Sequence, residues 1–117
     1  MVVANGAENT FSVFLGRGDG SFGTQVIYNT TNYPSTLLYG DFNLDKIMDL
    51  AVVSQRSSQM NILINSGNVT FPNQATINTP ALPSGGICRD LNNDGKVDIA
   101  IISKKRYSLS VYLNQGT

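Results

Sequence analysis

The sequence contains no histidine, no tryptophan and only one cysteine among its 117 residues. Histidine is the usual general base and the commonest zinc ligand, so its absence removes Ser-His-Asp and Cys-His catalytic arrangements. Cys88 cannot form an internal disulfide, and its apolar neighbour Ile87 favours a buried small side chain over a reactive thiol. We therefore predict that the chain is not an enzyme.

Net charge and long apolar segments are absent as well. Eight Lys and Arg residues balance eight Asp and Glu residues, so no field attracts nucleic acid or anionic lipid. The one basic cluster, Lys104 to Arg106, is interpreted as a solvated turn. No run of eighteen apolar residues is present, and no basic-then-apolar leader follows Met1. We therefore expect no nucleic-acid partner, no membrane insertion and no visible signal peptide.

Acidic residues are scarce outside two short windows. Six of the eight fall within residues 41–49 and 90–98, which leaves Glu8 and Asp19 elsewhere. A surface that is acidic only for solubility would scatter its carboxylates along the chain. The concentration indicates that oxygen ligands are needed at two places.

One internal repeat organises the chain, with a period of 49 residues. This offset maps Asn43 onto Asn92 and Phe22 onto Phe71 without a gap. A fixed period between 20 and 50 residues is typical of solenoids and propellers. We divide the chain into a partial blade (1–40), a repeat (41–89) and a partial repeat (90–117), and we expect it to be a fragment of a larger propeller.

Each repeat reads as about four short strands. Period-two alternation predicts half-buried strands, and short β-branched runs bounded by polar residues predict strands buried on both faces. The alternating strands hold Phe11, Val13 and Leu15; Met60, Ile62 and Ile64; and Leu109, Val111 and Leu113. The runs buried on both faces are 1–4, 50–53 and 99–102, and the remaining strands are 36–40, 85–89, 25–29 and 74–78. The predicted fold is all-β, a partial β-propeller with about two blades of four-stranded antiparallel sheet.

Both acidic windows have the pattern D-x-N-x-D-x-x-x-D. Calcium takes six to eight oxygen ligands at about 2.3 to 2.6 Å, which alternate residues of a tight loop can supply. Three carboxylates held this close repel by about 4 kcal/mol per pair at an effective dielectric near 20, so a cation would relieve the loop. We predict two structural Ca²⁺ sites. The predicted ligands are the side chains of Asp41, Asn43, Asp45, Asp49, Asp90, Asn92, Asp94 and Asp98 and the backbone carbonyls of Ile47 and Lys96.

Two other interpretations of the windows are weaker. Asp-Asn-rich stretches often form plain turns, but two windows in register with the repeat favour metal binding. An EF-hand would need a bidentate Glu where Val52 and Ile101 stand, and helices in place of strands. The two sites should also differ, because position 6 needs positive φ and holds Gly95 in one window and Lys46 in the other. We predict that the second window binds calcium more tightly.

The sequence resembles the FG-GAP repeats, also called VCBS repeats, of integrin alpha-chain propellers and many secreted proteins. The resemblance is carried by D-x-N-x-D-G-x-x-D, by Leu15-Gly16-x-Gly18-Asp19-Gly20-x-Phe22-Gly23, and by the Pro-Ser step at 34–35 and 83–84. It covers essentially the whole chain, and it implies a β-propeller with structural calcium in the two windows. Departures are Lys46 and Pro72 at glycine positions of the family, and the absence of an acidic window before the first copy.

Three further motifs have simpler interpretations. Arg17-Gly18-Asp19 matches the tripeptide read by integrins, but the repeat requires a turn there, so we interpret it as a turn. The sequons at Asn29 and Asn68 are glycosylation acceptors if the chain is secreted. Tyrosines 28, 33, 39 and 107 could form a sugar platform, although packing between blades is the simpler role.

Together these features predict a non-catalytic, calcium-binding propeller module that is extracellular or on the cell surface. Its partner would be a protein or a glycan, with adhesion as one role. One alternative is a carbohydrate-binding lectin, and another is a non-catalytic part of a propeller enzyme such as a polysaccharide lyase. Because two blades cannot close a ring, further propeller blades or self-association through open edges are also expected.

Overall fold

The computed structural model describes residues 1–30, 33–67, 71, 73–105 and 107–115. The described residues form ten strands and one 3-10 helix. They are β1 (Val2–Asn5), η1 (Gly6–Glu8), β2 (Thr10–Val13), β3 (Val26–Asn29), β4 (Pro34–Gly40), β5 (Asp49–Ser54), β6 (Gln59–Ile64), β7 (Asn73–Asn78), β8 (Pro83–Arg89), β9 (Asp98–Ser103) and β10 (Ser108–Tyr112). The described residues include no helix long and apolar enough to cross a membrane.

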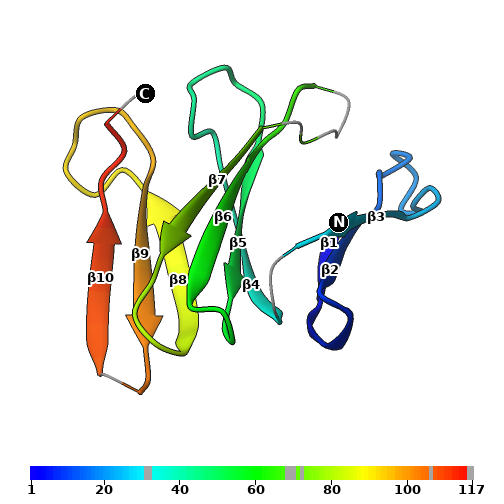
Figure 1. Ribbon diagram of the computed structural model, residues 1–117. Helices are drawn as coiled ribbons and strands as arrows, with labels where there is room; N and C mark the ends of the chain where they lie inside the picture. Colours follow the sequence, from blue (N-terminus) through cyan, green and yellow to red (C-terminus); the bar gives the residue numbers. More distant parts are fainter. Residues whose placement is uncertain (31–32, 68–70, 72, 106, 116–117) are drawn as a thin grey trace.

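The strands form three antiparallel sheets that stand side by side along the chain (Figure 1). The first sheet has the order β1-β2-β3, the middle sheet β4-β5-β6-β7 and the last sheet β10-β9-β8. Every pairing joins strands that follow one another in the sequence, as in an up-and-down meander. The sheets do not close into a ring, so the predicted all-β, partial-propeller fold class is confirmed.

Among the described residues, only the middle sheet has four strands, and its boundaries do not coincide with those of the predicted repeat. The predicted repeats begin at residues 41 and 90, where the acidic windows start. Each window connects the first strand of a sheet to its second, β4 to β5 and β8 to β9, so each predicted repeat begins within a sheet. Corresponding strands nonetheless match at the 49-residue offset, including a register shift next to Pro34 in β4 and next to Pro83 in β8. The repeated sequence therefore builds repeated local geometry.

Two apolar cores lie between the sheets. The core between the first and middle sheets contains Phe11, Val13, Leu50, Val52 and Leu63, with Val2, Tyr28, Leu37 and Phe71 packed against them. The core between the middle and last sheets contains Leu38, Ala51, Val53, Met60, Ile99 and Ile101, with Phe42, Ile62, Ile77, Cys88 and Tyr112 packed against them. The middle sheet therefore buries both of its faces.

The prediction of strands buried on both faces is correct for β5, holds for three of the four residues of the run in β9, and is wrong for β1. All six residues of β5 are buried, whereas Val3 in β1 is 40 % exposed and Ile102 in β9 is 51 % exposed. The alternating strand at Leu109 is likewise exposed on its apolar side. The physical reason is that each end sheet packs on one neighbour only, within the part of the chain that the structure describes.

Candidate metal centre

The first loop, Asp41–Asp49, connects β4 to β5 and is wound around its own carboxylates. Asp41 accepts backbone N–H bonds from Asp45 (3.0 Å) and Lys46 (2.8 Å), and Asp45 accepts one from Ile47 (2.8 Å). Leu44 and Lys46 have φ of 61° and 69°. These positive angles let the chain turn tightly enough to bring alternate side chains together.

The second loop, Asp90–Asp98, connects β8 to β9 and repeats this winding. Asp90 accepts N–H bonds from Asp94 (3.1 Å) and Gly95 (2.8 Å), and Asp94 accepts one from Lys96 (2.9 Å). Asn93 and Gly95 have φ of 64° and 84°. The prediction of positive φ at position 6 is confirmed in both loops. Lys46 is not a glycine, so its positive φ costs about 1 to 2 kcal/mol of backbone strain.

The last aspartate of each loop is fully buried and fixes the loop to the sheet. Asp98 accepts one N–H bond from Leu91 (2.9 Å) and another from Asn114 (2.8 Å), which follows β10. The pKa of Asp98 is lowered below its ordinary value of 3.8, mainly by the N–H bond from Asn114 and next by the bond from Leu91. The positive charge of Lys96 contributes less. Asp98 is therefore ionised at neutral pH.

The second loop brings its three carboxylates together. Asp90, Asp94 and Asp98 can each offer an oxygen such that these atoms all lie within 4.8 Å of one another. Two ligands on opposite sides of a calcium ion are about 5 Å apart, so this spacing fits one ion. Carboxylate and amide oxygens are hard donors, whereas the soft donors that favour zinc or copper are missing from the loop. The residues therefore fit a hard divalent cation.

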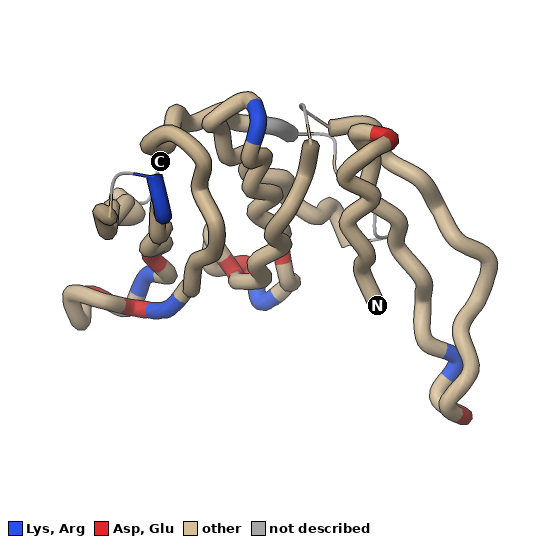
Figure 2. The backbone as a smooth tube through the Cα atoms, turned by 90° about the horizontal axis from the view of Figure 1, so that it is seen from below, with Lys and Arg blue, Asp and Glu red and all other residues tan. Residues whose placement is uncertain are grey.

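The first loop is arranged differently. Among the described residues, the carboxylates of the second loop form the one group with this spacing, so those of the first loop do not meet it. In the first loop, the Asn43 amide donates to a carboxylate oxygen of Asp45 at 3.0 Å. This N–H group therefore occupies the side of the carboxylate oxygen to which a cation would bind. Figure 2 shows the acidic residues of the two loops on the tube. The carbonyls of Ile47 and Lys96 stay predicted ligands.

Two asparagines outside the predicted ligand set position these loops. Asn65 follows β6, and Asn114 follows β10 at the 49-residue offset. The amide of Asn65 donates to the Met48 carbonyl at 3.1 Å. The amide of Asn114 donates to the Val97 carbonyl at 3.2 Å and also to Phe42 in the first loop at 2.7 Å. Their recurrence in the repeat was the signal that could have identified them.

The other candidate residues lie apart from the loops. Asp19 accepts bonds from the N–H (2.9 Å) and hydroxyl (2.6 Å) of Ser21, and these bonds lower its pKa, so it closes its own turn. Cys88 is half-buried, its thiol donates to the Tyr39 carbonyl at 2.8 Å, and burial raises its pKa. Asn29 is exposed at the end of β3, whereas the sequon at Asn68 lies outside the described residues.

The four tyrosines do not form one platform. Tyr28 stacks on Phe11 at a centroid distance of 5.0 Å and also contacts Phe71, within the core between the first and middle sheets. Tyr33 lies under the guanidinium of Arg56 at 4.4 Å. Tyr39 and Tyr107 are exposed on β4 and on the β9–β10 turn.

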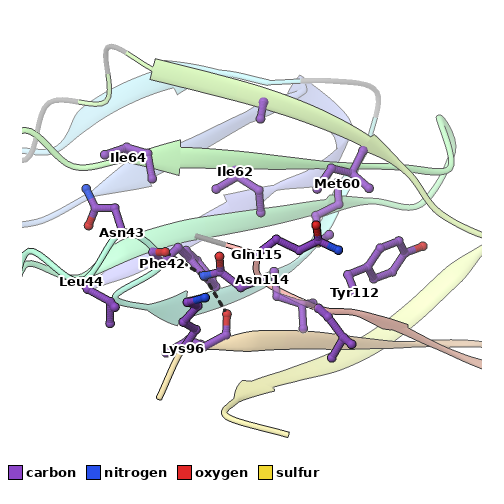
Figure 3. Close-up of a pocket in the computed structure, with 15 residues that line it drawn as sticks. Phe42, Asn43, Leu44, Met60, Ile62, Ile64, Lys96, Tyr112, Asn114 and Gln115 are labelled. Carbon is purple, nitrogen blue, oxygen red and sulfur yellow. Dashed lines mark hydrogen bonds between the residues drawn. The ribbon is translucent and has the colours of Figure 1, made fainter. Parts of the chain in front are cut away.

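A groove of about 860 Å³ lies between residues of the middle and last sheets, beside the loops (Figure 3). Met60, Ile62 and Ile64 line one side, and Tyr112 lies across from them. Polar side chains, including Asn43, Lys96, Asn114 and Gln115, gather near the loops. Between the first and middle sheets, Phe71 packs against Phe11, with the ring centroids 6.1 Å apart.

Comparison with known proteins agrees with the repeated loops and sheets. No curated protein and no solved structure gives a significant match to the chain. The FG-GAP-like repeat family matches it twice, over residues 1–52 and 41–101, and the two matches overlap at the first loop. Because these matches span most of the sequence and follow its 49-residue period, the chain belongs to the FG-GAP-like repeat family.

Proposed function

We propose that this chain is a non-catalytic, calcium-binding β-propeller module of an extracellular or cell-surface protein. Each loop would hold one structural Ca²⁺ ion. The proposed ligands are the side chains of Asp41, Asn43, Asp45 and Asp49 in the first loop and of Asp90, Asn92, Asp94 and Asp98 in the second, with the carbonyls of Ile47 and Lys96. In the second loop, the ion would neutralise three carboxylates that the fold holds together.

The observation that carries the calcium proposal is the spacing of the three carboxylates in the second loop. Their oxygens converge within 4.8 Å although like charges repel, and a bound cation would remove that repulsion. Backbone N–H bonds already orient Asp90 and Asp94, so calcium binding would cost little side-chain conformational entropy. Each loop also joins two strands of one sheet, so an ion there would stabilise the fold.

The groove between the middle and last sheets supports a role in binding a protein or a glycan. Its floor is apolar and its polar residues gather at the loop end, which is the composition of many ligand sites. Calcium would act on such binding indirectly, because Phe42, Lys96 and Val97 contribute to both the groove and the loops. An exposed Asn29 sequon and millimolar extracellular calcium suit a location outside the cell.

Calcium titration by calorimetry, with a thermal scan in calcium and in EGTA, tests the proposal. At a hundredfold excess over its dissociation constant, each bound ion adds about 2.7 kcal/mol to the free energy of unfolding. Chelation should therefore lower the melting temperature, and Asp94→Asn should reduce that difference. Glu8→Gln, outside both loops, is the control. A melting temperature that EGTA leaves unchanged would contradict calcium binding.

A further inference from the structure

One face of the last sheet exposes a row of aliphatic side chains. Ile87, Ile102, Leu109 and Val111 are 53 %, 51 %, 65 % and 50 % exposed. Cross-strand pairing places them on one side, because Ile87 and Val111 both pair with Ala100 and Leu109 pairs with Ile102. They surround a hollow of about 440 Å³ whose lining contains no charged residue. We call these four residues the trailing face.

The middle sheet shows what this face does when it is covered. The residues 49 positions before Ile87, Ile102 and Leu109 are Leu38, Val53 and Met60, respectively. Their side chains are 8 %, 0 % and 0 % exposed, because they pack against the last sheet. The trailing face therefore has the sequence pattern of an interior face, although no sheet among the described residues covers it.

The first sheet exposes the complementary surface, on its side away from the middle sheet. Met1, Val3 and Ile27 are 57 %, 40 % and 55 % exposed there. Val3 and Ile27 both pair with Ser12, which places them in one row. We call Met1, Val3 and Ile27 the leading face.

The middle sheet provides the covered form of the Met1 and Val3 positions, whereas the counterpart of Ile27 is Thr76, which is exposed. The counterparts of Met1 and Val3 at the 49-residue offset are Leu50 and Val52, which are 3 % and 0 % exposed against the first sheet. Polar positions correspond too, since Ser12 maps onto the buried Asn61. Met1 and Val3 of the leading face therefore have the pattern of a surface that packs on another sheet.

We propose that the trailing face binds the leading face of a second copy of this chain, head to tail. Both interfaces inside the chain pair these two kinds of face, so the contact between copies continues an arrangement already present. Neither face contains a charged side chain, and the N-terminal ammonium of Met1 donates to the Phe14 carbonyl at 2.8 Å. The net charge of zero gives no overall repulsion between copies.

One contact of this interface can be named. In the first–middle interface, Phe71 of the middle sheet packs on Phe11 of the first sheet. At the 49-residue offset, Phe22 corresponds to Phe71, and Leu109 corresponds to Met60 and Phe11. Phe22 is 45 % exposed, so Phe22 of the second copy would pack on Leu109. The proposal depends on sheet packing and not on calcium.

Complementation between two blocked variants tests the head-to-tail contact. Leu109→Glu blocks the trailing face, and Val3→Glu blocks the leading face at a position whose counterpart, Val52, is buried in the first–middle interface. Leu109 and Val3 are 65 % and 40 % exposed in the single chain, so folding should be retained. Sedimentation velocity should show wild-type mass rising above 12.6 kDa with concentration, as a ring or an open polymer. Each variant alone should stay monomeric, and their equimolar mixture should double in mass.

Three results would overturn the proposal. The first is a wild-type protein that is monomeric at every concentration. The second is self-association of Val3→Glu alone, which would indicate a contact between two trailing faces. The third is a mixture of the two variants that stays monomeric. Leu15→Glu is the matched control, because Leu15 is 58 % exposed but belongs to neither face, and it should associate like the wild type. Circular dichroism spectra of all variants verify the fold.

A cross-link gives an independent readout. In a Cys88→Ser background, Phe22→Cys and Leu109→Cys proteins should form a disulfide-linked heterodimer when they are mixed and oxidised. Each protein alone should form at least tenfold less linked dimer. Equal homodimer formation by Leu109→Cys would contradict the head-to-tail pairing.

Discussion

The amide of Asn114 donates a hydrogen bond to the backbone carbonyl of Phe42 at 2.7 Å, and so joins the last sheet to the first acidic loop. The same amide donates to Val97 of the second loop at 3.2 Å. One side chain thereby connects the two proposed calcium loops, which lie at the same end of the sheets (Figure 1). This contact spans 72 residues of sequence.

Replacing Asn114 with Ala should lower the free energy of unfolding by about 1 to 3 kcal/mol, because two side-chain hydrogen bonds are lost and part-buried carbonyls are left unpaired. Urea denaturation measures this change. Asn65→Ala is the matched control, since the Asn65 amide donates to the Met48 carbonyl of the adjacent loop at 3.1 Å. An equal loss in both variants would show that the bridge between loops contributes nothing.

The two loops should differ in calcium affinity. The second loop should bind more tightly, because its carboxylates already converge and Gly95 adopts positive φ without strain. Calorimetric titration of Asp49→Ala reports the second loop, and titration of Asp98→Ala reports the first. Equal residual affinities would contradict this prediction.

Lys46→Gly should stabilise the protein by about 1 kcal/mol, because glycine relieves the positive φ of 69° at this position. Urea denaturation in EGTA isolates this backbone effect from metal binding. Lys96→Gly is the control, since Lys96 is outside the residues with positive φ and glycine should destabilise the chain there. Loss of stability in Lys46→Gly would refute the strain argument.

Gly86→Ala should destabilise the protein by about 1 to 3 kcal/mol through overpacking. A Cβ atom at Gly86 would lie 2.7 Å from the Ala100 carbonyl oxygen and 2.8 Å from Cδ1 of Ile101. Gly85→Ala on the same strand is the control, because nothing lies within 4 Å of its added Cβ. Thermal unfolding of both variants should show a clear drop for Gly86 only.

The Cys88 thiol should react slowly with iodoacetamide in the folded protein. Burial raises its pKa above the ordinary 9.0, so the thiolate that reacts is scarcer at neutral pH than in the unfolded chain. The folded state favours the protonated thiol, so this contribution to stability is present below pH 9.0 and is lost as the pH rises through the folded pKa. Equal alkylation rates in native and urea-unfolded protein at pH 8 would contradict it.

The sequence alone determined the local structure and the repeat. Alternating and continuous apolar runs located the strands, since side chains of a strand alternate between faces. The spacing of Asp, Asn and Gly located both loops and predicted positive φ at Lys46 and Gly95, because loop winding depends on neighbouring residues. Family membership followed from the same short motifs.

Only the tertiary structure decided which faces are buried and what holds the loops. Leu109 and Met60 occupy the same repeat position, yet one is 65 % exposed and the other 0 %, because burial depends on which sheet stands opposite. The buried Asp98 is held by the N–H of Asn114, 16 residues away in sequence. Such contacts form between strands that the fold brings together, and no local pattern encodes them.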